Sequence, residues 1–348
     1  MAPSLIQGVP PLLPTTVVGS YATPSWLWTA WDEIEKGNYG TTDVNETLND
    51  AVNIAIWDQE KAGVDIITDG EMRRQFFIMS FYSRFTGVEP LPPLRKIGYL
   101  GYDSLGRFKL VGRIAAPQGL GVIEEFKYLK DNTVRPVKVT CPGPLTMGYS
   151  IEMEGNRVFK DRMELNWDLS KIINTELKAL VEAGAEFIQV DEPDYAIIPG
   201  GIEDWVSLFN ATVEGVNSKI ALHICFGNFA SRPLGKRTYR WVFPAILDAK
   251  ADQLVLEFAN REMKEIEMWK ELGVEKELGA GLVDVKSFYV ETPEDVAERI
   301  RLALKYVPVE KLYINPDCGF AKLPRWLSFL KLKNMVEGTR IVRRELEG

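Results

Sequence analysis

Short runs of β-branched and apolar residues alternate along this chain with longer stretches whose apolar side chains recur at helical spacing. The runs predict strands at 15–20, 64–71, 136–144, 186–193, 219–227, 253–258, 277–285 and 311–320. The stretches predict helices at 43–62, 160–184, 203–217, 239–249, 260–273, 292–306 and 324–345. Eight strand–helix units favour an α/β fold of the (β/α)8 TIM-barrel type over an open doubly wound sheet.

One stretch, residues 72–135, breaks this alternation after the second predicted strand. It is longer than a helix with two loops, and it carries the short runs YLGYDS and FKLVGRI. We therefore expect residues 1–348 to form a single barrel domain, with 72–135 as an inserted β-hairpin or small subdomain over the barrel mouth. The insertion could act as a lid over the site or be an elaboration without a function, and the sequence pattern fits both.

Composition limits the classes of protein to consider. The 348 residues are 46% hydrophobic and 26% charged, with a net charge of -8, so a basic stripe for nucleic acid is not expected. No stretch approaches the roughly 20 apolar residues of a membrane span, and the N-terminus does not resemble a signal peptide. We expect a cytoplasmic protein. Three cysteines are too few for a disulfide framework, which leaves metal binding, catalysis or packing as their uses.

Two of these cysteines lie in segments that suggest a metal site. The single histidine, His223, lies two residues before Cys225 in ALHICFGNF, and Cys318 follows the last predicted strand. Residues i and i+2 of a strand point to the same side, so His223 and Cys225 can bind one ion together. For an isolated H-x-C, a buried strand with a small apolar thiol would be the simpler interpretation.

The barrel interpretation places functional residues at the carboxyl ends of the strands. Glu257 ends the otherwise apolar run QLVLEF, where a carboxylate needs a partner or a cation. With His223, Cys225 and Cys318 it forms a ligand set that suits tetrahedral zinc. The ligands come from distant strands and not from paired C-x2-C knuckles, so we expect a catalytic zinc. Such a zinc would activate a substrate thiol for S-alkylation.

The motifs in this chain resemble a known family over nearly its whole length. VVGS, DGE, CPGPLTM, QVDEP, HICFG, LEFANR, GAGLVDVKS and NPDCGF are similar, in this order, to the catalytic C-terminal half of cobalamin-independent methionine synthase. The resemblance implies methylation of L-homocysteine to methionine on zinc in a (β/α)8 barrel. It assigns the zinc ligands to His223, Cys225, Glu257 and Cys318.

The resemblance also implies a site for the amino acid itself. The donors of Val18, Gly19 and Ser20 would bind its carboxylate, and Glu71 and Asp191 would receive its ammonium group. Two simpler roles remain open at this stage. Glu71 could pair with a neighbouring arginine in DGEMRR, and one acid of the DEP motif could cap the loop that follows.

Several departures from the family concern the methyl donor. The folate-binding N-terminal barrel of the full-length enzymes is expected to be missing. Where the family has a tryptophan that packs on the pterin, this chain has the segment 147–150, which contains no tryptophan. Ile197 stands in place of the family's pterin-binding glutamate, and Lys286 in place of its proton-supplying histidine. We therefore expect methylcobalamin or a methylated corrinoid protein as donor, in preference to 5-methyltetrahydrofolate. The role of Lys286, as a salt-bridge partner in a loop or as a cation of the site, stays open.

Two other functional classes remain. A coenzyme M methyltransferase or epoxyalkane transferase would share the H-x-C and the distal cysteine, but its sulfonate substrates call for cations where this chain offers carboxylates. A non-catalytic zinc-containing subunit of a corrinoid methyl-transfer complex would bind zinc without turning over free methylcobalamin. Uroporphyrinogen decarboxylases share the barrel fold and need no zinc cluster.

Overall fold

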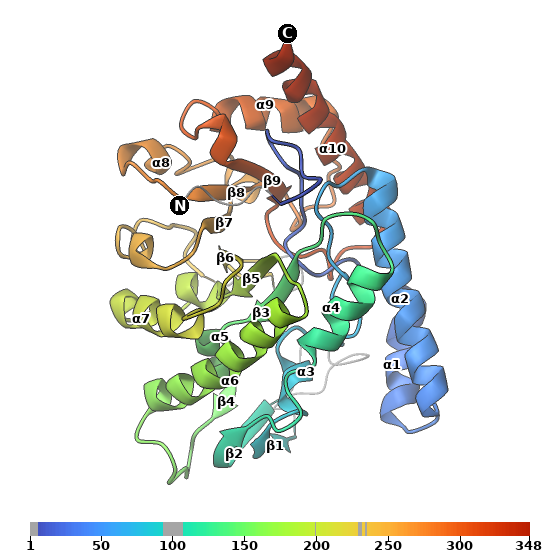
Figure 1. Cartoon of the computed structure of the whole chain (residues 1–348), viewed down its shortest axis with the longest axis vertical. Coiled ribbons are helices and arrows are strands. Elements are labelled where there is room, and N and C mark those ends of the chain that lie inside the picture. The colour runs from blue at the N-terminus through green and yellow to red at the C-terminus, as the bar shows by residue number, and fades with distance from the viewer. Residues whose placement is uncertain (1–5, 93–106, 199, 229–231, 234) are drawn as a thin grey trace.

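The computed structural model describes residues 6–92, 107–198, 200–228, 232–233 and 235–348 (Figure 1). Its main sheet has six parallel strands in the order β3-β5-β6-β7-β8-β9. These strands are β3 (Val139–Pro142), β5 (Phe187–Asp191), β6 (Lys219–Ile224), β7 (Gln253–Glu257), β8 (Glu277–Val283) and β9 (Leu312–Pro316). All six are buried, and each lies within a run that predicts a strand, so the parallel α/β sheet is confirmed.

The first two predicted strands are present only as single bridges. Thr15 is bridged to Ile314 of β9, and Thr16 to Ile66, in both cases in parallel. A third parallel bridge joins Ile67 to Val137, just before β3. The segments around residues 15 and 66 therefore lie between the two edge strands of the six-stranded sheet.

Five predicted helices are confirmed. They are α2 (Thr41–Ala62), α6 (Arg162–Glu182), α7 (Ile202–Thr212), α9 (Pro293–Ala303) and α10 (Arg325–Glu347). The helices lie around the strands, and α10 packs against both α2 and α9 (Figure 1). The start of α9 follows from its sequence, because the Thr292 side chain accepts from Asp295 N while the Asp295 carboxylate accepts from Thr292 N.

Two predicted helices are wrong in length. The segment 239–249 forms only the 3-10 helix η3 (Ala245–Asp248), because Pro244 cannot donate a backbone hydrogen bond within a helix. The segment 260–273 contains the tail of η4 (Ala259–Arg261) and the short α8 (Met268–Glu271). Between them Glu262, Met263 and Glu265 have positive φ, which no α-helix tolerates.

The described residues of the segment 72–135, which are 72–92 and 107–135, contain four elements: α3 (Met79–Tyr82), β1 (Thr86–Leu91), β2 (Arg107–Ala115) and α4 (Val122–Asp131). Strands β1 and β2 are antiparallel, and β4 (Ile151–Glu152) pairs with β2. Helix α4 packs against β3 and α6, so this part of the segment belongs to the alternating body. The run YLGYDS lies outside the described residues, and a position of the hairpin over the mouth stays a prediction.

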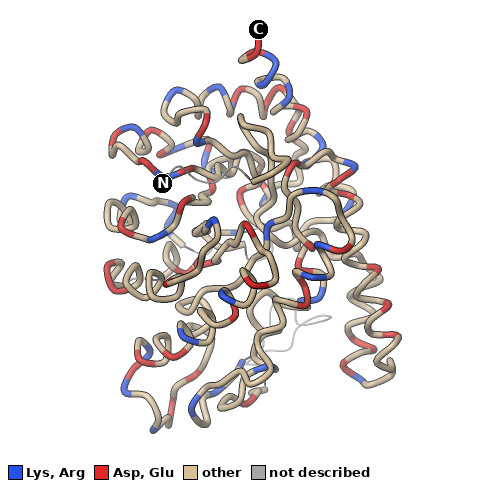
Figure 2. Tube along the Cα trace, in the orientation of Figure 1, with Lys and Arg blue, Asp and Glu red and all other residues tan. Residues whose placement is uncertain are grey.

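The remaining elements are short, apart from one helix. They are α1 (Ser25–Glu35), α5 (Pro144–Tyr149), η2 (Pro193–Ala196) and η5 (Val309–Lys311). Basic and acidic residues are interleaved along the outer helices (Figure 2). Within the described ranges, no helix has the length and apolar character needed to cross a membrane.

Candidate metal centre

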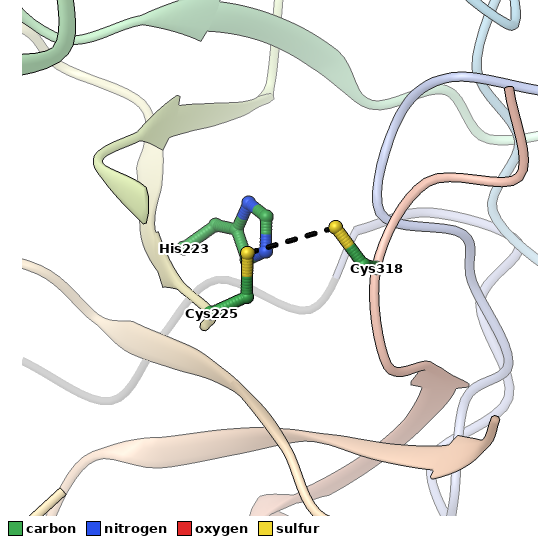
Figure 3. Close-up of side chains that lie close together, drawn as sticks. All are labelled: His223, Cys225 and Cys318. Carbon is green, nitrogen blue, oxygen red and sulfur yellow. Dashed lines mark hydrogen bonds between the residues drawn. The ribbon is translucent and has the colours of Figure 1, made fainter. Parts of the chain in front are cut away.

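Three potential metal ligands meet at the carboxyl ends of β6 and β9. His223 lies near the end of β6, Cys225 directly follows that strand, and Cys318 follows β9 by two residues. Their side chains point toward one another (Figure 3), and their ligand atoms all lie within 4.8 Å of one another. The i, i+2 spacing on one strand thus brings an imidazole and a thiol to one side of the sheet.

The distances within this group fit a tetrahedral ion. The sulfur atoms of Cys225 and Cys318 are 3.6 Å apart. Two thiolates bound to one zinc ion at about 2.3 Å each, at the tetrahedral angle, would be about 3.8 Å apart. The imidazole is also correctly oriented, because Nδ1 of His223 lies 2.7 Å from Oδ1 of Asp191 while the buried Nε2 has no hydrogen-bond partner among the described residues. That nitrogen is therefore available as a ligand.

The pKa values of the two cysteines are shifted in opposite directions. The hydrogen bond from Cys225 lowers the pKa of Cys318 well below its usual range, against the effect of burial, and His223 acts in the same direction. The same hydrogen bond and burial raise the pKa of Cys225 well above its usual range. The lowered pKa of Cys318 favours its thiolate form, which is the form that binds metal ions.

The surroundings of His223 favour the protonated imidazole. Burial alone would lower its pKa, but the hydrogen bond with Asp191 and the negative charges of Asp191 and Cys318 outweigh burial and raise the pKa to about 9. Asp191 accepts the Nδ1 proton and so fixes the orientation of the ring. Binding of a metal at Nε2 would displace a proton from the imidazolium.

Glu257, the fourth predicted ligand, ends β7 but is not a member of the group of three. Its Oε2 accepts from Lys286 Nζ at 2.7 Å and from Phe226 N at 3.2 Å. Its Oε1 is buried without a hydrogen-bond partner in the described part of the chain. The role of Glu257 as a ligand therefore stays a prediction, and the structure shows Lys286 in an ion pair with it.

This ion pair is fully enclosed. The side chains of Lys286 and Glu257 are 1% and 0% exposed. Burial raises the pKa of Glu257, and the charge of Lys286 opposes that shift. Burial would lower the pKa of Lys286, but Glu257 and the two cysteines outweigh it and raise the pKa. The two side chains are therefore shielded from solvent beside the cysteines.

The loops around the pair are fixed by buried carboxylates. Asp317, next to Cys318, accepts from the backbone N–H groups of Phe258, Ala259 and Asn260 at 2.9, 2.9 and 2.6 Å. The Asn260 side chain donates to both oxygens of Asp284, whose Oδ1 also accepts from Lys286 N at 2.7 Å. These bonds connect the loops that follow β7, β8 and β9.

The residues expected to bind the amino acid carboxylate lie beside the cysteines. Ser20 O accepts from Phe320 N at 2.8 Å, two residues after Cys318, and Val18 O accepts from Gln189 Nε2 at 2.6 Å. Gly19 O accepts from the Thr68 hydroxyl at 2.8 Å. These carbonyl oxygens are thus occupied, and binding of an anion by the N–H groups of residues 18–20 stays a prediction.

The two expected ammonium-binding carboxylates have different surroundings. Asp191 binds His223 through Oδ1, and its buried Oδ2 has no partner among the described residues. Glu71 Oε1 accepts from Thr140 Oγ1 at 2.6 Å and from Arg74 at 3.1 Å, so the arginine pairing considered from the sequence is present. Burial raises the pKa of Glu71 to about 7, although Arg74 opposes the shift. Binding of the ammonium group by Asp191 and Glu71 stays a prediction.

The other acid of the DEP motif has a structural role. Glu192 accepts from Leu145 N, Thr146 N and the Thr146 hydroxyl, at 3.0, 2.9 and 2.6 Å, and so holds the start of α5. The alternative that one member of the pair caps a neighbouring segment thus applies to Glu192. Asp191 is the member that reaches the histidine.

Sequence reasoning missed the buried residues behind Asp191. Gln189 donates from Nε2 to Asp191 Oδ1 at 2.7 Å and accepts from Lys138 Nζ at 2.6 Å. Lys138, Gln189 and Asp191 thereby form a chain of side chains that ends at His223. The contact between Gln189 and Asp191 could have been predicted from the motif QVDEP. The two residues are two positions apart on one strand and therefore face the same side.

Comparison with known proteins gives this site its context. The family model described as "Cobalamin-independent synthase, Catalytic domain" matches residues 13–340. The chain belongs to the cobalamin-independent methionine synthase family. This family membership confirms the resemblance read from the motifs, and it confirms the prediction of an enzyme.

Relatives in this family match the chain over nearly its full length. A methionine synthase of Saccharolobus solfataricus is 39% identical over 97% of both chains, and one of Sulfurisphaera tokodaii is 36% identical over 97% of this chain and 94% of that protein. Among solved structures, a B12-independent methionine synthase from Shewanella sp. W3-18-1, in complex with selenomethionine, is similar with a TM-score of 0.82 and 30% identity. This match covers 96% of this chain and 99% of that one.

Proposed function

We propose that this protein is a zinc-dependent methionine synthase that transfers a methyl group to the thiol of L-homocysteine. The observation that supports it most directly is the group of His223, Cys225 and Cys318, with ligand atoms within 4.8 Å of one another, next to groups that suit an amino acid. The relatives named methionine synthase favour this function over a coenzyme M transferase or a non-catalytic subunit.

The substrate side of the proposal rests on charge complementarity. The backbone N–H groups of residues 18–20 suit a carboxylate, and the Asp191 oxygen that has no partner among the described residues, together with Glu71, suits an ammonium group. The Shewanella structure holds selenomethionine, which carries the same zwitterion as methionine. An amino acid bound in this way would direct its side-chain thiol toward the cysteines.

Bound zinc would activate the substrate thiol, which is the nucleophile. Zinc bound by His223, Cys225 and Cys318, with Glu257 as a further ligand, would lower the pKa of the homocysteine thiol and keep it as a thiolate at neutral pH. The chain's own contribution is to hold the imidazole through Asp191 and to fix the cysteine loops through Asp317. Positioning of the thiol against the methyl group provides the rest of the rate enhancement.

We further infer that the sheet closes into a (β/α)8 barrel whose mouth carries this site. The three parallel bridges at Thr15, Thr16 and Ile67 support closure, because they join β9 to β3 through the first two predicted strands. A closed barrel would place residues 18–20 and Glu71 beside the ends of β6 and β9. The cytoplasmic location likewise remains a prediction.

The methyl donor is the least supported part of the proposal. Replacement of the family's pterin-contacting residues by Ile197 and Lys286 argues against 5-methyltetrahydrofolate, and this was the reason to expect methylcobalamin or a corrinoid protein. The comparisons do not support a corrinoid donor or partner, since the family model and the Shewanella protein are both described as independent of the cofactor. The donor must therefore be assigned by assay.

The test combines metal analysis with turnover. Purified protein is analysed for zinc and then assayed for methionine from L-homocysteine, with methylcobalamin and with 5-methyltetrahydrofolate in parallel. Coenzyme M replaces homocysteine as the control thiol. About one zinc per chain and methionine from either donor would support the proposal, and the donor that works would be identified. Methylation of coenzyme M alone, or full activity without zinc, would overturn it.

A further inference from the structure

The ion pair between Lys286 and Glu257 raises a question that the proposed function leaves open. A carboxylate meant to bind zinc is held instead by a buried ammonium group at 2.7 Å. Both side chains are almost completely enclosed, at 1% and 0% exposure, so solvent does not screen the pair. Lys286 therefore competes directly with any metal for the charge of Glu257.

The pair is built into the loops and is not an accidental surface contact. The backbone N–H of Lys286 donates to Asp284, which in turn is held by the Asn260 side chain. Oε2 of Glu257 also accepts from Phe226 N, in the residue that follows Cys225. The carboxylate is thus fixed through one oxygen, and its other oxygen, Oε1, is buried without a partner in the part of the chain described.

We propose that Lys286 is a positioning residue that restrains Glu257, so that the carboxylate stays a weak ligand and a coordination position remains open for the substrate thiol. This inference rests on the proposed zinc function. Three ligands already meet within 4.8 Å without Glu257, and tetrahedral zinc needs only one more. A carboxylate that is free of Lys286 would occupy that position and compete with homocysteine.

The charge balance supports the same role. Two thiolates, a carboxylate and an incoming substrate thiolate would place four negative charges around one divalent ion. The ammonium group of Lys286 offsets one of them in an enclosed site where no water can do so. With a neutral side chain at this position, Glu257 would be more strongly attracted to zinc. Binding of the substrate thiolate as a further anion would then be disfavoured.

The experiment is a double-mutant cycle on metal binding, with Lys286→Met, Glu257→Gln and the combined variant. Zinc dissociation constants come from competition with a chromophoric chelator, and coordination is followed in the visible absorption bands of Co²⁺-substituted protein. We expect Lys286→Met to bind zinc about tenfold more tightly and to show a raised KM for homocysteine. Adding homocysteine should change its Co²⁺ spectrum less than that of the wild type. In the Glu257→Gln background the Lys286→Met substitution should raise zinc affinity much less than it does alone, because the competing carboxylate is gone.

The control for loss of a buried lysine is Lys219→Met. Lys219 pairs with Glu277 at 2.5 Å, with side-chain exposures of 4% and 8%, at the opposite ends of β6 and β8 from the cysteines. It should change thermal stability without changing zinc affinity.

Weaker or unchanged zinc binding in folded Lys286→Met, or an effect of the same size in the Glu257→Gln background, would overturn the inference. Failure of the wild type to bind zinc would instead overturn the proposed function.

Discussion

The carboxylate of Asp191 lies 2.7 Å from Nδ1 of His223, so the acid expected to bind substrate also orients a metal ligand. Its second oxygen is buried without a partner among the described residues. The two functions thus fall on the two oxygens of one side chain. Metal binding and recognition of the ammonium group are predicted to be coupled at this residue.

Substitution Asp191→Asn should therefore affect both functions. The amide oxygen accepts a weaker hydrogen bond from Nδ1–H of the ligand than a carboxylate does, so we expect zinc affinity to fall by about ten- to a hundredfold. KM for homocysteine should rise in the same variant, because the amide does not attract an ammonium group. Chelator competition and steady-state kinetics measure the two effects. Asp194→Asn, which changes another buried acid three residues away, is the control and should leave zinc affinity unaltered.

Cys318→Ser should abolish metal retention and activity together. Removing one of two sulfur atoms that are 3.6 Å apart leaves the imidazole and a single thiolate, and a serine hydroxyl is a poor zinc ligand at neutral pH. Metal analysis after gel filtration measures retention. The matched control is Cys141→Ala, since Cys141 is buried in β3 outside the group of three. Full zinc content in Cys318→Ser would refute the assigned ligand set.

Gly19→Ala should damage substrate binding while sparing the metal. A Cβ at position 19 would lie 2.6 Å from Oε1 of Glu71, which would have to move away from Thr140 and Arg74. We expect KM for homocysteine to rise by about tenfold or more, the effect of losing one charged contact, with the zinc dissociation constant unchanged. Gly112→Ala is the control, because its Cβ would meet ordinary contact at 3.6 Å. A normal KM in Gly19→Ala would contradict the placement of the amino acid.

The buried Lys138 predicts a pH dependence of stability. Burial lowers its pKa to about 7, although Asp191 and Glu71 oppose the shift, whereas the unfolded chain keeps the ordinary value of 10.5. Between pH 7 and 9 the unfolded state therefore binds more protons at Lys138 than the folded state does. The free energy of unfolding should rise with pH over this range, by about 2 kcal/mol relative to a Lys138→Met variant. Urea unfolding of both proteins at pH 7 and 9 measures the difference, and parallel behaviour of the two would show that Lys138 does not titrate there.

The strand periodicity and the H-x-C spacing predicted much of this molecule. The i, i+2 rule placed His223 and Cys225 on one side of β6, and parallel strands brought Cys318 to the same end. These relations follow from local geometry and from the common direction of the strands, and both can be read from sequence.

The contacts that sequence did not reveal depend on tertiary structure. The partner of Lys286 is Glu257, 29 residues earlier, and no spacing rule relates the loop after β8 to the end of β7. The truncated helix at 260–273 has the same origin. There Glu265 adopts positive φ while accepting from Thr238, Tyr239 and Arg261, so tertiary bonds override helix propensity.

The two halves of the proposed site differ in how firmly the backbone supports them. His223 and Cys225 extend from β6, which is paired along its length with β5 and β7, whereas the segments leading to Ser20 and Glu71 join their neighbours through isolated bridges at Thr15, Thr16 and Ile67. Amide exchange should be faster in the sparsely bonded segments than in β6. We therefore predict that the segments expected to bind the amino acid change conformation more readily than the strand that carries His223 and Cys225.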